Sequence, residues 1–191
     1  HLAAMPCSPP SAMNNEELEE VDGPQAPAPG SHAQLPFAYP LRDVNFLFNE
    51  VFDAPAHYRK LQSELSEEAG GAEDAEPLTP DFVDMINKEG AKFAEETIAP
   101  LYGPGDTPCD YRPNGDVITP VGYREAYQEF AAAGWSGLTV PVKYGGQGMP
   151  MSMGVIKSEM LGTANWSWAM YPGLSVGAMN TLILHGSEVS W

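Results

Sequence analysis

An amphipathic stretch that runs directly into a glycine-rich segment, across residues 123–150, limits the possible folds of this chain more than any other feature. Apolar residues recur in it at the spacing of one helical face, and they are Tyr123, Tyr127, Phe130 and Ala131. Gly134 follows as a helix-ending signal, and three glycines then fall within residues 145–148, just before Pro150. The segment therefore predicts a helix that ends at Gly134 and a tight loop that leads to the next helix.

Helical spacing recurs along much of the remaining chain, whereas no stretch alternates convincingly at the period of a strand. Helices are predicted over residues 41–52, 56–66, 79–99, 120–133, 152–162 and 167–185. The first of these helices is expected to bury Leu41, Val44, Phe48 and either Val51 or Phe52. The third is expected to bury Phe82, Ile86, Phe93, Ala94 and Ile98. Gly90 costs the third helix about 1 kcal/mol relative to alanine, which predicts a local weakness. No internal repeat of solenoid length appears, so the predicted class is all-α, a helical bundle.

Two threonine–proline pairs are typical of helix starts. Thr79 precedes Pro80, and Thr119 precedes Pro120. A threonine hydroxyl accepts hydrogen bonds from the free amides of a first turn, and proline is tolerated at the first helical position. Asn114-Gly115, between the two pairs, predicts a turn.

The charge of the chain excludes several classes of partner. Nine Lys and Arg against 26 Asp and Glu give a net charge of −17, which repels nucleic acid and anionic lipid surfaces alike. No apolar run approaches the roughly 18 residues of a spanning helix, so no membrane insertion is expected. Cys7 and Cys109 lie far apart and have no metal-ligand spacing, which argues against zinc and a disulfide framework and favours an intracellular compartment.

The chain divides by composition into five parts. Residues 1–36 hold seven prolines and the acidic run 16–20, and such a segment is expected to be disordered because it buries too little apolar surface. A helical extension over 37–66 and an acidic, glycine-bearing linker over 67–77 follow. The main helical domain is predicted at 78–188, and residues 189–191 form a short tail.

Several of these segments, taken together, resemble one protein family. The segments are 123–150, Ser158-Glu-Met-Leu161, 164–178 and Leu184-His-Gly-Ser-Glu188. In this order they resemble the N-terminal helical domain of the flavin-dependent acyl-CoA dehydrogenases. Residues 41–52 also resemble an N-terminal extension that one branch of the family carries. Residues 189–191 do not continue the family pattern and the chain opens on His1, so we expect a fragment truncated before the middle β-domain.

The resemblance implies the chemistry of the intact enzyme. Such an enzyme binds an acyl-CoA, removes an α-proton with a glutamate and passes the β-hydrogen as hydride to FAD, which gives a trans-2-enoyl-CoA in fatty acid β-oxidation. Most flavin contacts and the catalytic glutamate would lie in domains that this chain lacks. We therefore expect the chain alone to retain no FAD and to be inactive. The resemblance also implies a homo-oligomer, and it leaves the compartment open among mitochondrial, peroxisomal and cytoplasmic.

The last predicted helix carries the candidate substrate site. Ala169, Gly173 and Gly177 are four residues apart and share a face that lacks bulk, which suits either a neighbouring backbone or a ligand. The resemblance implies that this helix lines the acyl cavity. The expected substrate-binding residues are Ala169, Tyr171, Pro172, Gly173, Leu174 and Gly177. We hypothesise that they accommodate a wide or substituted acyl group.

Other residues admit a functional and a structural interpretation. The loop at 141–148 could cradle a phosphate, but it matches neither GxGxxG nor a P-loop, which favours a structural turn. Trp166 and Trp168 straddle Ser167, so either core filling or contact with another domain fits. The remaining polar candidates are expected to be a helix cap (His185) and solvated carboxylates (Glu125, Glu129 and Glu159).

A second hypothesis is of a different class. A truncated chain can act as a non-catalytic helical interaction module, or have no independent function. Its apolar faces over 79–99 and 120–133, with Trp166 and Trp168, would then be exposed and would promote self-association.

Overall fold

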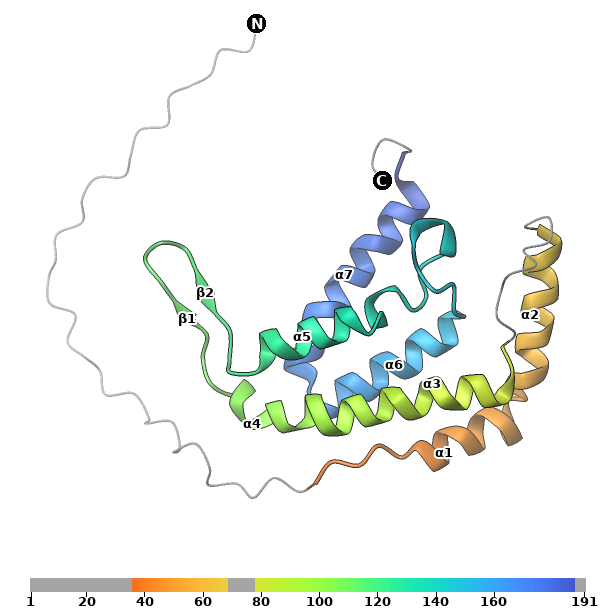
Figure 1. Cartoon of the computed structure of the whole chain (residues 1–191), viewed down its shortest axis with the longest axis horizontal. Helices are drawn as coiled ribbons and strands as arrows, with labels where there is room; N and C mark the ends of the chain where they lie inside the picture. The colour runs from red at the N-terminus through yellow and green to blue at the C-terminus, as the bar shows by residue number, and fades with distance from the viewer. Residues whose placement is uncertain (1–35, 69–77, 188–191) are drawn as a thin grey trace, which may run out of the picture. The chain divides into compact units, whose positions relative to one another are not determined.

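The computed structural model describes residues 36–68 and 78–187, so the disorder predicted before residue 36, most of the 67–77 linker and the 189–191 tail lie outside the described residues. Seven α-helices are described: α1 (Leu41–Phe46), α2 (Ala54–Glu68), α3 (Pro80–Phe93), α4 (Tyr102–Gly105), α5 (Tyr123–Ala132), α6 (Met151–Ala164) and α7 (Trp166–His185). π-helical turns follow α1 (Leu47–Val51) and α3 (Ala94–Ile98), and 3-10 turns lie at Ala99–Leu101, Trp135–Gly137 and Val142–Tyr144. Two short strands, β1 (Asp110–Tyr111) and β2 (Val117–Ile118), complete the described part of the chain (Figure 1). The predicted all-α class is confirmed.

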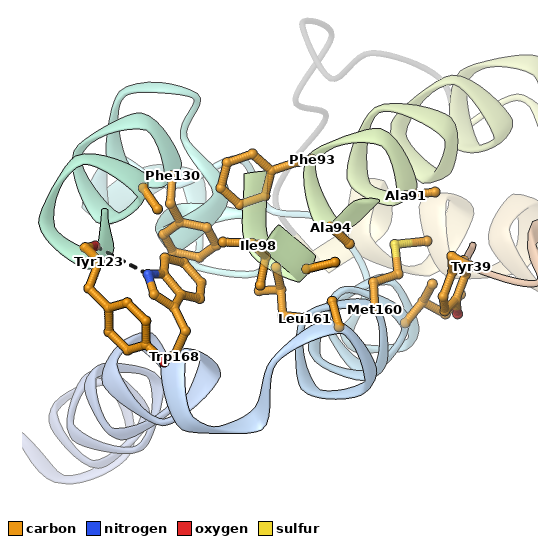
Figure 2. Packing of buried hydrophobic residues seen from close by; sticks show 14 of the residues in the cluster. Tyr39, Ala91, Phe93, Ala94, Ile98, Tyr123, Phe130, Met160, Leu161 and Trp168 are labelled. Atoms are coloured by element: carbon orange, nitrogen blue, oxygen red, sulfur yellow. Dashed lines mark hydrogen bonds between the residues drawn. The ribbon is translucent and has the colours of Figure 1, made fainter. Parts of the chain in front are cut away.

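Aromatic side chains from three helices form the centre of the main core. Phe93 of α3, Phe130 of α5 and Trp168 of α7 meet at ring-centroid distances of 5.6 to 6.2 Å, with Trp168 edge-on to both phenylalanines (Figure 2). Tilted and edge-to-face contacts of this kind add stability beyond the area they bury. Predicted core residues Phe93, Ala94 and Ile98 are buried here, while Phe82 and Ile86 pack at the edge of a second cluster around Tyr58, Val83 and Leu138.

Gly90 does not interrupt α3. A Cβ at this position would lie 2.9 Å from Met160 Sδ and 3.4 Å from the Trp135 ring, so the glycine permits close packing on α6. The irregular turn lies further on, at Ala94–Ile98, where the helix widens to π geometry. The helix is thus continuous at Gly90, and the local weakness predicted there stays a prediction.

The first threonine–proline prediction is confirmed and the second is wrong. The Thr79 hydroxyl accepts from the Phe82 amide at 3.2 Å and caps α3. Thr119 caps nothing, because α5 begins only at Tyr123, after Gly122 in the left-handed region at φ 86°. The buried face of α5 consists of Tyr123, Ala126 and Phe130. Tyr127 and Ala131 were expected on that face, but both are exposed.

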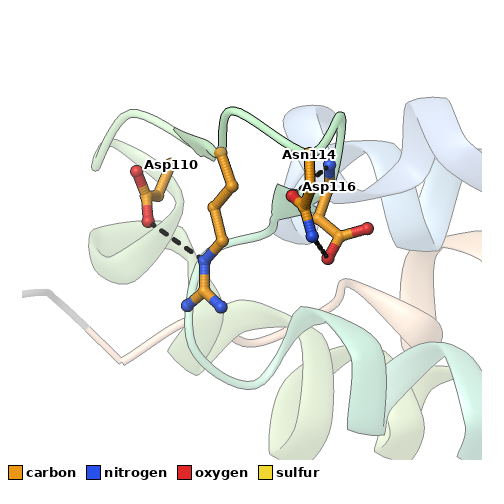
Figure 3. A network of polar contacts seen from close by, with 4 residues as sticks. Asp110, Asn114 and Asp116 are labelled. Carbon is orange, nitrogen blue, oxygen red and sulfur yellow. Dashed lines mark hydrogen bonds and ion pairs between the residues drawn. The ribbon is translucent and has the colours of Figure 1, made fainter.

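The Asn114-Gly115 turn is confirmed, and it joins two strands that the sequence did not reveal. Strands β1 and β2 pair antiparallel, with Asp110 opposite Ile118. Asn114 donates to Asp116 at 2.7 Å, and Arg112 lies 3.7 Å from Asp110 (Figure 3). Each strand is two residues long, too short for an alternating pattern to show.

The extension packs on the main domain through one tyrosine above all. Tyr39 is buried, its amide donates to Glu95 at 2.8 Å, and its hydroxyl donates to Glu159 at 2.9 Å. Burial and the Glu159 carboxylate together raise the pKa of the Tyr39 hydroxyl. Further along, Asn45 donates to Asp84 at 2.8 Å, and the Tyr58 hydroxyl lies 2.9 Å from Ser152 Oγ. The extension is thus fixed by polar contacts as well as by apolar packing.

Lys157 is a buried cation on α6. Its Nζ donates to the Trp135 carbonyl at 2.9 Å and lies 5.7 Å from the centre of the Phe130 ring. Burial lowers the pKa of this amine. Within the described ranges no carboxylate pairs with it, so a carbonyl beyond the end of α5 and an aromatic face stabilise the charge instead.

Asn165 connects α6 to α7 and is fully buried. Its Oδ1 accepts from the Trp168 amide at 3.1 Å, from Ser167 Oγ at 2.9 Å and from the Tyr123 hydroxyl at 3.4 Å. The Trp168 indole in turn donates to the Tyr123 carbonyl at 3.2 Å (Figure 2). Nδ2 of Asn165 has no hydrogen-bond partner among the described residues. One oxygen therefore fixes the start of α7, while the amide nitrogen is left unsatisfied.

Replacing Asn165 tests this division of roles. Asn165→Ala should lower the free energy of unfolding by about 2 kcal/mol, more than Thr79→Ala at the exposed cap of α3, because three donors lose their acceptor. Asn165→Asp keeps the accepting oxygen but puts an ionisable carboxyl at a fully buried position, so part of its cost should disappear at a pH low enough to protonate that carboxyl. Urea unfolding followed by circular dichroism measures the free energy of unfolding of all three variants. A loss with Asn165→Ala no larger than with Thr79→Ala would contradict the role of the Asn165 oxygen at the start of α7.

Candidate functional site

The candidate site lies along the outward face of α7. Trp166, Met170 and Leu174 follow one another at helical spacing on this face and are exposed, Leu174 to 71%. Gly173 and Gly177 lie between and beyond them and are also exposed. The result is an apolar stripe in which bulky side chains alternate with glycine.

The six predicted substrate-binding residues divide between two faces of α7. Pro172 is buried and Ala169 packs against the main core, so both support the helix from beneath. Gly173, Leu174 and Gly177 are exposed on the other side. Tyr171 stands at the margin, with its ring edge-on to Tyr123 at 6.0 Å. The structure brings together Gly173, Leu174 and Gly177, and it places Ala169 and Pro172 behind them.

Packing within the described part of the chain does not explain why residues 173 and 177 are glycine. A Cβ built on Gly173 or Gly177 would meet no heavy atom within 4 Å. A glycine inside a helix costs about 1 kcal/mol relative to alanine. By contrast, a Cβ on Gly154 of α6 would lie 2.7 Å from Thr139 Cγ2, so that glycine is explained by packing. The open glycines favour close approach of a group outside the described chain.

Pro172 interrupts the hydrogen bonding of α7 directly behind this face. It lies inside the helix and has no amide hydrogen, so the Trp168 carbonyl lacks its usual intrahelical donor. The helix nevertheless continues to His185. The turn before Pro172 is held by Asn165 and Tyr123, whereas the residues after it are mostly exposed.

Three residues of the site region were not predicted from the sequence. Met170 extends the stripe, and its spacing from Trp166 and Leu174 was available as a signal. Asn165 and Tyr123 act through tertiary hydrogen bonds between α5 and α7, for which the sequence offers no spacing rule.

The two tryptophans lie in different environments, so core filling is seen for one of them, and contact of the other with a further domain stays a prediction. Trp168 is 1% exposed and fills the core, while Trp166 is 67% exposed on the stripe. The apolar faces over 79–99 and 120–133, expected to be uncovered in an interaction module, are instead buried through Phe93, Ile98 and Phe130. That expectation is wrong because α3, α5, α6 and α7 supply one another with partners.

The loop at 141–148 is a structural turn. The amides of Gly145, Gly146 and Gly148 donate to carbonyls of Val142, Pro141 and Val140, and Gln147 donates to Gly137. A Cβ on Gly146 would lie 2.1 Å from the Val140 oxygen, so only glycine fits. Since these amides are already used, the loop offers no cradle for a phosphate.

The polar candidates keep structural roles. His185 lies in the last turn of α7 and is exposed, and its capping role stays a prediction. Glu125 and Glu129 are exposed, and Glu129 accepts from Thr97 at 3.4 Å. Glu159 was expected to be only solvated, but it accepts from the buried Tyr39 hydroxyl and so anchors the extension.

The described residues do not form a complete cofactor site. The two best-formed recesses, one at Asn45, Tyr58 and Asn87 and one at Phe93 and Lys157, each have room for about one water molecule. Drug-sized ligands and cofactors occupy cavities of roughly 300–1,000 Å³. No cluster of His, Cys, Asp and Glu among the described residues could hold a metal ion. Nor does any helix in these ranges combine the length and apolarity that spanning a bilayer requires.

Comparison with known proteins agrees with this fold. Residues 81–189 match the family model described as "Acyl-CoA dehydrogenase, N-terminal domain". The chain is also 31% identical over 154 residues to the 3-methylmercaptopropionyl-CoA dehydrogenase of Ruegeria pomeroyi (strain ATCC 700808 / DSM 15171 / DSS-3). That alignment covers 81% of this chain and 24% of the relative, so the chain spans about a quarter of the relative's length.

Alanine at the open glycines tests whether they are retained at a cost in stability. Gly173→Ala and Gly177→Ala should each raise the free energy of unfolding by up to about 1 kcal/mol, since alanine favours the helix and meets no neighbour. The control, Gly154→Ala, should lower it because of the contact with Thr139. Urea unfolding measures all three. Destabilisation by both Gly173→Ala and Gly177→Ala would mean that this face is already covered in the isolated chain.

Proposed function

The chain belongs to the acyl-CoA dehydrogenase family, of which it carries the N-terminal domain, and from this membership we propose that it forms one wall of the acyl cavity of an FAD-dependent enzyme. The whole enzyme would oxidise the CH–CH bond of an acyl-CoA thioester to a trans-2-enoyl-CoA, as part of fatty acid β-oxidation. The observation that carries the proposal is the open glycine face of α7, with Gly173 and Gly177 uncovered beside Leu174.

The chemistry of this face suits an acyl chain. From Trp166 to Leu184 the side chains of α7 carry no charge, and the exposed ones include Met170 and Leu174. An apolar wall without charged groups binds alkyl chains by the hydrophobic effect and costs no desolvation of ions. The glycines add depth, because the helix backbone itself becomes part of the surface. The proposed wall therefore comprises Gly173, Leu174 and Gly177, with Tyr171 at its edge and Ala169 and Pro172 as its support.

The proposed substrate is an acyl-CoA whose acyl group is wide or substituted. A glycine face admits more bulk than a face of Leu or Ile would. The name of the Ruegeria pomeroyi relative gives it a thioether acyl group as substrate, which supports a substituted chain. Met170, with its polarisable sulfur, suits contact with such a group.

FAD belongs in this proposal to the intact enzyme. The recesses of the described chain are far too small for a flavin, so the cofactor would be held mainly by other domains. This chain's contribution is positioning: the α5–α7 contacts fix the wall against which the acyl chain lies. Homo-oligomerisation, and self-association of the chain through the exposed stripe, are proposed on the same basis.

The isolated chain should hold no flavin. After incubation with FAD and desalting, its visible absorption spectrum should show no flavin band, and no enoyl-CoA should form from acyl-CoA with an artificial electron acceptor. Retained flavin absorbance would mean that this domain holds more of the cofactor site than proposed, and product formation would contradict its supporting role.

Gly173→Leu in a full-length enzyme that carries this domain tests the wall itself. The leucine side chain would fill the open face, so KM should rise for wide acyl-CoA substrates by about tenfold, the effect of roughly 1.4 kcal/mol. KM for short, linear substrates should change little. Ser175→Leu, at an exposed position two residues along, is the matched control for added bulk. Unchanged selectivity in Gly173→Leu would contradict the proposal.

A further inference from the structure

A second uncovered apolar face lies on α1 and the π-turn that follows it. Phe46, Leu47, Val51 and Phe52 are all exposed there, Phe46 to 58% and Phe52 to 67%. Val51 or Phe52 was expected to be buried, and neither is. Asp43 and Glu50 are exposed on the same short segment. We call these six residues the acidic-apolar face.

The segment cannot turn this face inward, because its other side is already fixed. Val44 is buried in the main core, with Leu41 and Phe48 packed against it. Asn45 donates to Asp84 of α3 at 2.8 Å, and Phe48 contacts the Tyr58 ring at a centroid distance of 6.5 Å. A segment that is apolar on both sides needs a second partner for the side that remains in water.

The charges on the face indicate what that partner carries. Asp43 and Glu50 are three and four residues from Phe46, so on a helix they share its side of the segment. Neither carboxylate forms an ion pair among the described residues. The one cation in residues 41–53 is Arg42. Covering the apolar residues would also bury these carboxylates, at a cost that only a cationic partner offsets.

Two other occupants fit the charges poorly. A second copy of this face would bring carboxylates against carboxylates, and like charges across an interface cost several kcal/mol. An anionic lipid surface would repel the same carboxylates, and the chain as a whole carries −17.

We propose that the acidic-apolar face of the extension is a docking surface for a protein segment that combines apolar side chains with Lys or Arg, such as a basic amphipathic helix. Apolar contacts to Phe46, Leu47, Val51 and Phe52 would supply most of the affinity. Asp43 and Glu50 would select for cationic partners and exclude acidic ones. The inference concerns the extension and stands independently of the acyl wall on α7.

A pair of synthetic peptides tests the proposal with the whole chain. One is an amphipathic helix of leucine and lysine, and the other has glutamate at each lysine position. Binding of each labelled peptide is followed by fluorescence anisotropy. The lysine peptide should bind, and the double variant Phe46→Ser/Val51→Ser should weaken it by about tenfold or more, the loss typical of interface anchors. The double variant Val121→Ser/Leu184→Ser, which removes exposed apolar residues elsewhere without a change in net charge, should leave it within about twofold.

A charge-reversed variant keeps the test decisive if the serine variant unfolds. Asp43→Lys/Glu50→Lys should weaken the lysine peptide and gain binding of the glutamate peptide, with thermal unfolding by circular dichroism as the check on folding. Equal weakening by the Val121/Leu184 control would show that the peptide binds exposed apolar side chains non-specifically, and undiminished binding to Phe46→Ser/Val51→Ser would show that overall negative charge alone attracts it; either result would overturn the proposal. Equal binding of both peptides to the unaltered chain would overturn the charge selection. A dimer in sedimentation velocity that Phe46→Ser/Val51→Ser dissociates would identify a second copy as the occupant instead.

Discussion

The burial of Trp168 is the interaction on which most of this domain depends. The indole packs edge-on against Phe93 and Phe130, and its N–H donates to the Tyr123 carbonyl at 3.2 Å. A buried indole needs both an apolar surround and one acceptor, and here the acceptor belongs to the first residue of α5. One side chain therefore fixes α7 against α3 and α5 at once. The backbone amide of the same residue is held by Asn165, so its position along α7 is fixed as well.

This anchoring explains why α7 presents two unlike faces. The first turns are held by Asn165, Tyr123 and the aromatic core, and Pro172 continues the buried side. A helix fixed on one side must direct its remaining residues outward, whatever their polarity. Trp166, Gly173 and Leu174 are outward for that reason and not because they favour water. The exposure of the stripe is thus a consequence of the core, and it leaves the stripe open for the proposed contact with an acyl chain.

The sequence predicted the parts of this structure that depend on local chemistry. Thr79-Pro80, Asn114-Gly115 and Gly134 act through the backbone of their own segment, and all three were identified. Predictions from the sequence failed where a residue distant in the chain decides the local structure. Thr119-Pro120 resembles a helix start, but it follows β2, and the chain reaches helical geometry only after Gly122. Tyr127 and Ala131 lie outside the buried face of α5 because ring contacts with Phe93 and Trp168 hold Phe130 inward.

For the candidate site the limit was of the same kind. The spacing of Ala169, Gly173 and Gly177 predicted a single face without bulk, because helical periodicity shows only that residues four apart are neighbours. Periodicity does not show which of these neighbouring residues pack against the core and which are exposed. Ala169 falls on the core side and Gly173 on the open side, since the direction of α7 is set by Trp168 and Asn165. Glu159 was misjudged similarly, because its partner Tyr39 is 120 residues away in the sequence.

The two uncovered apolar faces differ in one property that separates their roles. The stripe on α7 has no charged side chain between Trp166 and Leu184, so it can be covered completely by apolar groups without desolvating an ion. The face on α1 carries Asp43 and Glu50 beside its phenylalanines, so purely apolar cover there would leave carboxylates buried and unpaired. An acyl chain or a dry helix contact therefore suits the first face, and only a partner with its own cations suits the second. Asn45 and Val44 hold the segment behind the face on α1, and Trp168 holds the helix behind the stripe on α7, so each face has its own support in the core.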